Sequence, residues 1–194
     1  MILPIVSYGQ SVLRQKCEEI DQTYPDLNKL IEDMWETLYP ADGSGLAASQ
    51  VGHLIKLFIV DSKEVFDRME AEERVEFFVG DKGIKETFIN AKITKYSDDL
   101  WIEDEGCLSI PTLSEEVTRS WTIEIEYFNK DFQKQTKTYS GTTARIIQHE
   151  FDHTEGKLYI DYVNPLKRKL LNSKLIKISK GEIKAKYKMV YGKS

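Results

Sequence analysis

Two histidines four positions apart, in His149-Glu150-Phe151-Asp152-His153, are the residues of this chain best suited to chemistry. On an α-helix, side chains four residues apart lie on one face, one turn apart, so both imidazoles can reach a single metal ion. Glu150, beside the first histidine, is then close enough to handle the protons of a metal-held water. Chance can also place two histidines on an ordinary core helix, so other parts of the chain must decide.

The residues before His149 favour the helix that such a site requires. Positions 141–148 contain no proline, and Ala144, Ile147 and Phe151 follow at spacings of three and four. These spacings place an apolar stripe beside the histidine face. The sequence therefore predicts an amphipathic helix that carries both imidazoles.

A hydrolytic metal site also needs a third protein ligand and an open position for water. Cys107, in Glu105-Gly106-Cys107-Leu108-Ser109, is one candidate, because a metal-coordinated thiol is deprotonated and becomes a strong ligand. An intracellular cysteine is more often an inert small hydrophobe. Cys17 and His53 are the only other sulfur or imidazole candidates.

Length and composition indicate one globular domain. The 194 residues suffice for a sizeable core, and a content of 41% hydrophobic and 30% charged residues excludes a disordered or fibrous chain. The apolar start, Met1 to Val6, is short and lacks a basic leader, which argues against a signal peptide, and no apolar run approaches a membrane span. With two cysteines, a disulfide framework is not expected, and we expect a cytoplasmic location.

The net charge of −5 hides an asymmetry along the chain. From Pro165 to Ser194 there are ten Lys or Arg residues and a single acid, Glu182, so the rest of the chain is strongly acidic. A basic tail on an acidic body suggests a polyanionic partner, most simply nucleic acid. A solvated helix face explains the same pattern.

Hydrophobic periodicity predicts two further helices, at Pro25 to Tyr39 and from Pro165 to about Ser179. Five apolar side chains of the second helix are expected to point inward: Leu166, Leu170, Leu171, Leu175 and Ile178. Strands are predicted at 54–60, from 87, at 121–128 and at 133–139, with an extended segment at 183–191. Residues 62–87 are rich in charge and predict a surface excursion, partly helical.

The segment Gly43 to Gln50 contains a G-x-G-x-x-A pattern that could be mistaken for a dinucleotide fingerprint. That fingerprint requires a strand before it and a helix after it, whereas here a helix precedes and a strand follows. Nucleotide binding is therefore excluded on context. Small residues here instead suit the close approach of another backbone, as when an extended peptide pairs with an edge strand.

Three separated stretches together resemble, in order and spacing, the three motifs of the peptide deformylases: Gly43 to Gln50, Glu105 to Ser109 and His149 to His153. Ile2-Leu3-Pro4 and Val12-Leu13-Arg14 also look like that family, so the resemblance reaches about Pro165. It implies removal of the formyl group from the N-terminal formylmethionine of nascent polypeptides, with release of formate. The implied fold is α+β, with twisted antiparallel strands packed around a central metal-binding helix.

The resemblance also assigns roles to particular residues. The metal ligands map onto Cys107, His149 and His153, with Fe(II) the usual metal of the working enzyme and Zn(II), Ni(II) or Co(II) possible in purified protein. Glu150 maps onto the general acid/base that assists attack of a metal-bound hydroxide on the formyl carbon. The Gln50 side chain and the Leu108 backbone N–H would hold the formyl oxygen.

Substrate contacts implied by the same motifs are Gly43, Ser44, Gly45 and Gly106. Ser44, Ser49 and Arg145 depart from residues common in the family, so the pocket for the methionine side chain is not assigned. We expect one domain over 1–194, whose basic C-terminal helix and tail begin near 165. Because nascent chains are the implied substrate, the ribosome is a possible partner of that basic segment, and no membrane is expected.

Two other functions compete with this one. A zincin-type metallopeptidase shares the His-Glu-x-x-His helix but needs a further ligand well downstream, and no histidine follows His153. A structural zinc site that includes Cys17 would have four protein ligands and no water. We further expect an ion pair between Glu105 and Arg119, because a charge beside a probable core needs a partner.

Overall fold

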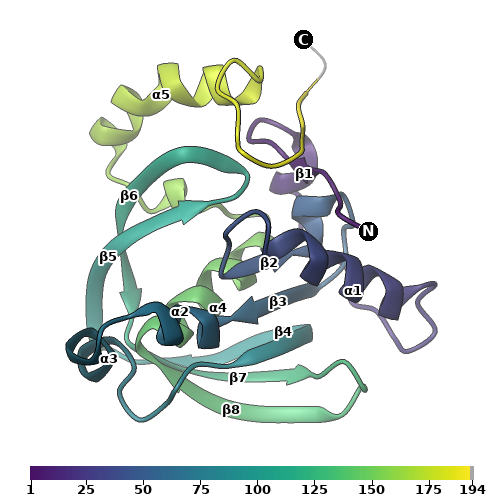
Figure 1. Ribbon diagram of the computed structural model, residues 1–194, viewed down its shortest axis with the longest axis vertical. Coiled ribbons are helices and arrows are strands. Elements are labelled where there is room, and N and C mark those ends of the chain that lie inside the picture. The colour runs from purple at the N-terminus through teal and green to yellow at the C-terminus, as the bar shows by residue number, and fades with distance from the viewer. Residues whose placement is uncertain (193–194) are drawn as a thin grey trace.

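The largest sheet of the described residues is antiparallel and has five strands in the order β2-β3-β4-β7-β8 (Figure 1). Its strands are β2 (Gly45–Ala47), β3 (Leu57–Asp61), β4 (Lys85–Tyr96), β7 (Thr122–Phe128) and β8 (Lys134–Ser140). The computed structural model describes residues 1–192. In β7 the alternation predicted from the sequence is confirmed, because Ile123, Ile125 and Tyr127 are buried while their neighbours are partly exposed.

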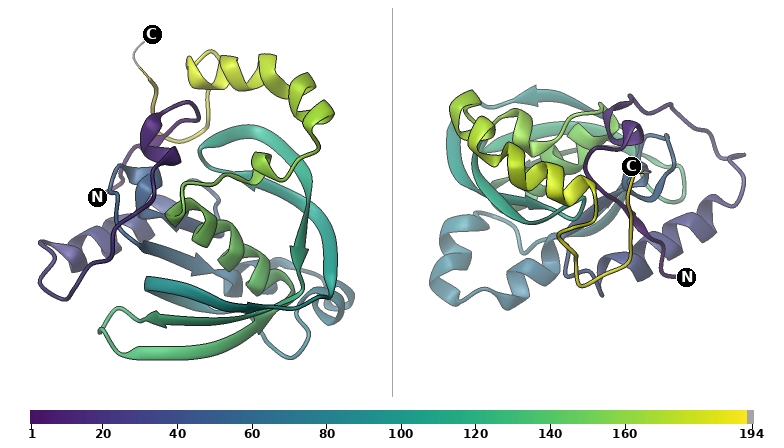
Figure 2. Two further views of the ribbon diagram at one scale, coloured as in Figure 1. Left: turned by 180° about the vertical axis from the view of Figure 1, so that it is seen from behind. Right: turned by 90° about the horizontal axis from the view of Figure 1, so that it is seen from above.

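Helix α4 (Gly141–Thr154) packs against this sheet, with contacts to β2, β3, β7 and β8 (Figures 1 and 2). Ala144 and Ile147 are fully buried against the sheet, as the apolar stripe predicted. The helix begins at Gly141, whose φ of 56° is left-handed and whose Cβ position would collide with the carbonyl of Phe77. Only glycine fits there, so the strand-to-helix junction is set by this one residue.

A long hairpin, β5 (Leu100–Cys107) and β6 (Ile110–Ser120), curves around the other side of α4 (Figure 2). The two strands pair from Leu100↔Ser120 to Gly106↔Ser114, and a register shift follows between Gly106 and Cys107. Strands β5 and β6 are not apparent from the sequence pattern. Their charged residues interrupt the apolar alternation, and most side chains of β5 are exposed.

Helix α1 (Leu27–Leu38) confirms the first predicted helix, although it begins two residues later, after Asp26 in a left-handed conformation. Leu30, Ile31 and Met34 are buried in the core that α1 shares with β2 and β3. The charged excursion contains two short helices, α2 (Ser62–Arg68) and α3 (Ala71–Phe77), which confirms its partly helical prediction. Residues 1–192 also contain three 3-10 turns, at Ser11–Arg14, Ala48–Val51 and Tyr159–Asp161.

The C-terminal helix α5 (Pro165–Ser179) has the predicted bounds, but the prediction of a continuous inward leucine face is wrong. Leu175 and Ile178 are buried with Leu13, whereas Leu166 and Leu170 are 71% and 77% exposed. The helix packs on the body through its C-terminal half, and its first turns extend over the outside of the hairpin (Figure 1).

The segment after α5 is only partly extended. Within it, β9 (Met189–Val190) pairs in parallel with β1 (Ile5–Val6), which ties the two ends of the chain together. No helix among residues 1–192 combines the length and the apolar character needed to cross a bilayer.

Candidate metal centre

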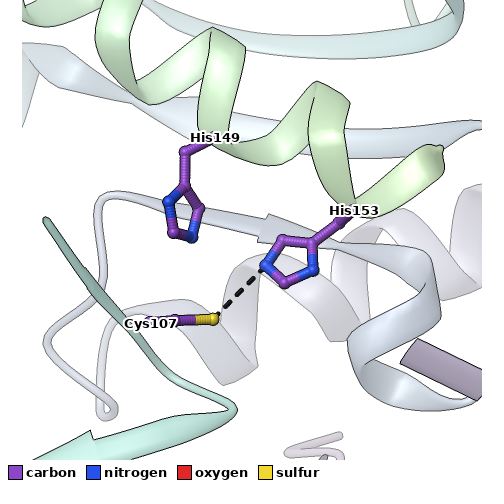
Figure 3. Close-up of side chains that lie close together, drawn as sticks. All are labelled: Cys107, His149 and His153. Carbon is purple, nitrogen blue, oxygen red and sulfur yellow. Dashed lines mark hydrogen bonds between the residues drawn. The ribbon is translucent and has the colours of Figure 1, made fainter. Parts of the chain in front are cut away.

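Cys107, His149 and His153 converge at one point between the hairpin and α4 (Figure 3). Each offers one ligand atom, and these atoms lie within 4.8 Å of one another. The Cys107 Sγ is 3.3 Å from the His153 Nε2, and the two imidazole centroids are 5.2 Å apart. Cys17 and His53 do not belong to this group, and it is the one such His/Cys/Asp/Glu cluster found among residues 1–192.

Local structure explains why three residues so far apart in sequence meet. One helical turn separates the two histidines, so both side chains leave α4 on the same side. Cys107 lies where the register of the hairpin shifts, and the turn at 108–109 directs its sulfur toward the helix. The site therefore depends on the docking of the hairpin onto α4.

A buried ionic network orients the first histidine. The Glu105 carboxylate lies 3.1 Å from the His149 Nδ1, which leaves the Nε2 of that ring for the cluster. Arg119 donates to both Glu105 oxygens at 2.9 Å and to Asp152 at 2.5 Å. The expected ion pair of Glu105 and Arg119 is confirmed, and both side chains are only 5% exposed.

Arg145 supplies the second positive charge of this network. It donates to Glu105 at 2.7 Å and to the carbonyls of Val117 and Trp101, and its guanidinium stacks on the Trp101 ring. Two carboxylates, Glu105 and Asp152, thus face two guanidinium groups, so the buried charge is balanced. Charge balance of this kind is what buried ionic groups require, although the Nε of Arg145 has no hydrogen-bond partner in the described part of the chain.

Burial and these partners shift the pKa values of the site. Burial raises the pKa of Glu105, but His149 and Arg119 outweigh burial and hold it well below the usual range, so Glu105 is ionised. Burial lowers the pKa of His153 well below its usual value, which keeps that imidazole neutral, as a metal ligand must be.

The pKa of His149 moves the other way. Burial lowers it, but the Cys107 sulfur and the Glu105 carboxylate outweigh burial and raise the pKa well above its usual value. The surroundings of His149 therefore favour a positive charge, which either a proton or a divalent cation can supply.

The donor set fits one divalent metal ion. Sulfur and nitrogen ligands bound tetrahedrally to a zinc-sized ion lie about 3.6 Å apart. The observed 3.3 Å between the Cys107 Sγ and the His153 Nε2 is close to that value. One thiolate and two imidazoles with a carboxylate behind one ring also match the supporting contacts usual for metal-bound histidine.

Glu150 lies beside the three candidate ligands on the face of α4 toward β2. It is 4% exposed, and its Oε2 is buried without a protein hydrogen-bond partner. Burial raises the pKa of Glu150 to about 7, a value suited to a group that both takes and returns a proton near neutral pH. A Cβ on Gly45 would lie 2.6 Å from the Glu150 Oε1, so glycine in β2 is required for the carboxylate to fit.

Gln50 has a fixed orientation. Its Oε1 accepts a hydrogen bond from the Ala47 N–H at 2.8 Å, so its amide nitrogen must be the group that faces the cluster. That nitrogen lies 3.5 Å from the Cys107 Sγ and 3.3 Å from the Ser109 Oγ. The side chain therefore presents N–H donors beside the candidate metal ligands.

A groove of about 970 Å³ gives access to these groups. Among the residues predicted from the sequence, those that line it are Gly43, Ser44, Gly45, Gln50, Gly106, Cys107, Leu108, His149 and Glu150. His153 lies beneath them and is 1% exposed. Space is also tight at Gly43, where a Cβ would lie 2.7–2.8 Å from side-chain carbons of Leu38 and Leu108.

Two walls of the groove were not predicted. One comes from α2 and α3 through Val65, Met69 and Phe77, and the other comes from tail residues 184–187. Two lysines of the basic tail, Lys184 and Lys186, therefore line the groove of the candidate metal centre. The local sequence pattern does not predict a contact between segments that lie about 80 positions apart in the chain.

The comparisons with known proteins agree with this geometry. The model of the family described as polypeptide deformylase matches residues 2–169. The chain belongs to the peptide deformylase family.

Relatives of this chain match it along nearly its whole length. Peptide deformylase of Christiangramia forsetii is 46% identical over 189 residues, covering 97% of this chain and 95% of its own. That of Flavobacterium psychrophilum is 47% identical over 189 residues, covering 97% and 96%. The crystal structure of peptide deformylase from Ehrlichia chaffeensis superposes with a TM-score of 0.80 at 28% identity, covering 94% of this chain and 99% of that one.

Neither alternative function gains support from the site. A zincin would use a glutamate after the helix, but Glu155 lies 2.8 Å from Lys16 in an ion pair and is absent from the metal-ligand cluster. A four-ligand structural site would need Cys17, which is buried elsewhere.

Proposed function

We propose that this protein is a metal-dependent peptide deformylase that hydrolyses the formyl group of N-formylmethionyl peptides and releases formate. The observation that carries the proposal is the convergence of Cys107, His149 and His153 beside the buried carboxylate of Glu150. We further propose one catalytic domain over 1–194, acting in the cytoplasm on nascent chains. Fe(II) is the proposed metal of the working enzyme, with Zn(II), Ni(II) or Co(II) as substitutes.

Cys107, His149 and His153 would hold the metal, and three protein ligands leave a further coordination position free. When bound, the cation acts as a Lewis acid that lowers the pKa of water and polarises a carbonyl. The thiolate of Cys107 cancels one unit of a divalent charge, which weakens that acidity. The base therefore has more to contribute here than at an all-histidine site.

Glu150 would serve as that base. Its unpartnered Oε2 can accept the proton of the attacking water, and the same carboxyl can then deliver it to the leaving amine. A pKa raised by burial to about 7 suits both transfers. Gly45 packs directly on Glu150 and holds the carboxylate in one place. The carboxylate therefore does not have to be reoriented when the reaction occurs.

Gln50 and the backbone N–H of Leu108 would stabilise the oxyanion that forms when the formyl carbon becomes tetrahedral. The Gln50 amide is pre-oriented by the hydrogen bond that its Oε1 accepts from Ala47, so its N–H groups already face the space beside the Cys107 sulfur. Donors fixed in advance stabilise developing charge more than mobile ones.

The substrate backbone would run along β2. This strand ends the sheet, so in the described part of the chain its outer edge has no strand partner. Gly43, Ser44 and Gly45 line the groove at this edge, where small residues let a peptide approach. Gly106 lines the groove from the hairpin side.

The test is formate release by purified protein loaded anaerobically with Fe(II). A short N-formylmethionyl peptide should yield one formate per peptide, and the same peptide with an acetyl group should yield no product. A chelator should abolish the reaction, and added metal should restore it. Cleavage of an internal peptide bond instead of formate release would support a metallopeptidase and refute the proposal.

The ribosome is the proposed partner of the basic tail, because the implied substrate is a nascent chain. Not every tail charge is available, since Lys167 forms an ion pair with Glu115 at 2.5 Å and Lys174 donates to the Thr112 carbonyl. The remaining exposed cations outside the groove include Lys169, Lys177, Lys180 and Lys188. A contact built on phosphate pairs weakens steeply as salt rises.

Reversing these four lysines to glutamate should abolish co-sedimentation with ribosomes at low salt and leave turnover of a short formylated peptide intact. A matched control instead reverses four exposed lysines of β4, β8 and the β7–β8 turn: Lys95, Lys130, Lys134 and Lys137. Equal loss in both variants would indicate a general charge effect. Undiminished binding of the tail variant would show that the tail is only a solvated face.

A further inference from the structure

The tail that follows α5 contributes a wall of the substrate groove, although it lies beyond the residues that match the family model. That match ends at residue 169, whereas Lys184, Ala185, Lys186 and Tyr187 line the groove. This wall is therefore supplied by a part of the chain that the shared motifs do not describe.

Tyr187 connects the tail to the turn that carries the cysteine ligand. Its hydroxyl donates a hydrogen bond of 2.7 Å to the carbonyl of Leu108, the residue directly after Cys107. Its ring is partly buried against the core cluster of α1 and β3. A short hydrogen bond from a ring that is itself packed holds the acceptor firmly, because little motion is left to the donor.

The main chain that follows Tyr187 is also fixed. Directly after it, the Lys188 carbonyl accepts from the Ile5 N–H at 2.9 Å, and the Val190 carbonyl accepts from the Ser7 N–H at 2.9 Å. These bonds belong to the β1–β9 pairing, which anchors the tail to the start of the chain. The hydroxyl of Tyr187 is thus presented from a braced segment.

The turn at 108–109 receives two other hydrogen bonds. The Tyr8 N–H donates to the Ser109 carbonyl at 2.8 Å, and the Gln50 amide reaches the Ser109 Oγ at 3.3 Å. Tyr187 is the contact that acts on the peptide plane between Leu108 and Ser109. That plane shares the Cα of Leu108 with the N–H proposed to hold the formyl oxygen.

We propose that Tyr187 is a positioning residue for deformylation, which orients the Leu108 turn and so aims its N–H at the oxyanion. The inference rests on the proposed function. An oriented Leu108 N–H contributes most when negative charge develops on the formyl oxygen in the transition state. Loss of the Tyr187 hydroxyl should therefore lower kcat more than it raises KM. One lost hydrogen bond of ordinary strength corresponds to about a 3- to 10-fold effect.

The test compares Tyr187→Phe, which removes only the hydroxyl, with Tyr191→Phe, a second tyrosine of the same tail that does not line the groove. Rates are normalised to bound Fe(II), and the thermal unfolding temperature is recorded for each protein. Tyr187→Phe should lose about 3- to 10-fold in kcat with KM within about 2-fold. Tyr191→Phe should match the wild type.

A spectroscopic readout separates positioning from general stability. In the Zn(II)-loaded protein, the ¹H–¹⁵N resonances of Leu108 and Ser109 should shift in Tyr187→Phe and stay in place in Tyr191→Phe. Unchanged kcat in Tyr187→Phe, or an equal loss in Tyr191→Phe, would overturn the inference. Absence of formate release by the wild type in the same assay would instead refute the proposed function, so the two failures are distinguishable.

Discussion

Arg119 gives the sharpest test of how the metal centre is supported. It is 5% exposed and makes three hydrogen bonds to carboxylates, two to Glu105 and one to Asp152. Arg119→Met keeps a similar length and volume but leaves both acids buried with Arg145 as the one remaining guanidinium of the network. Removing one partner of a buried ion pair costs about 3–5 kcal/mol.

For a chain of this size, about 2–4 °C of unfolding temperature is lost per kcal/mol, so Arg119→Met should unfold roughly 6–20 °C below the wild type. The matched control is Lys134→Met, which removes a surface ion pair with Glu126 whose side chains are 60% and 40% exposed. The free energy of unfolding of Lys134→Met should stay within about 1 kcal/mol of the wild-type value. Denaturant titration of both variants at neutral pH measures the difference.

The pH dependence of that difference has a definite sign. The pKa of Glu105 in the folded protein is lowered from its ordinary 4.5, so its pairing stabilises the fold above that pH and the contribution is lost as pH falls. The gap in free energy of unfolding between the wild type and Arg119→Met should therefore be widest near pH 7 and should narrow as the pH falls below about 4.5. If the free energy of unfolding of Arg119→Met at pH 7 lay within about 1 kcal/mol of the wild-type value, the reasoning would be refuted.

Arg119→Met should also weaken metal binding. Arg119 holds Glu105, and Glu105 orients His149. Loss of a contact that supports a metal-binding histidine typically costs about 10- to 100-fold in metal affinity. Competition with a chelator of known affinity measures it.

Two further changes test the reacting groups. Glu150→Ala should retain the metal, as measured by elemental analysis, and lose at least ~10²-fold in formate release, because the variant lacks the carboxylate proposed to take the proton; near-normal turnover by the loaded variant would exclude the role. Gly45→Ala places a Cβ 2.6–2.8 Å from three atoms of Glu150, so the carboxylate must move, and we expect about a 10-fold or greater loss of kcat/KM together with about 1–3 kcal/mol of stability. The control Gly192→Ala meets no atom within 4 Å and should behave as the wild type in both assays.

Several features of this protein follow from local sequence alone. The spacing of His149 and His153 on a proline-free amphipathic segment is a property of about one helical turn, so it can be read without the fold. The same holds for α1 and for the alternating strand β7, whose periodicities are short-range. The order and spacing of the three motifs also identified the family correctly.

Other features were decided by tertiary structure. The hairpin β5–β6 has too many charged residues for periodicity to reveal it, because two of its buried charges, Glu105 and Arg119, are satisfied by partners on α4. The exposure of Leu166 and Leu170 likewise depends on how far α5 overlaps the body, which the helical pattern does not contain.

The groove itself is the clearest case. Local sequence determined which residues could bind a metal and move a proton, because those properties belong to side-chain types and to spacings within one turn. Only the folded chain decided that α2, α3 and the tail would wall the site and that Tyr187 would reach Leu108, 79 positions away. Such contacts arise from the packing of whole elements, and no local periodicity encodes the distance between two segments that meet only after the sheet and its helix have assembled.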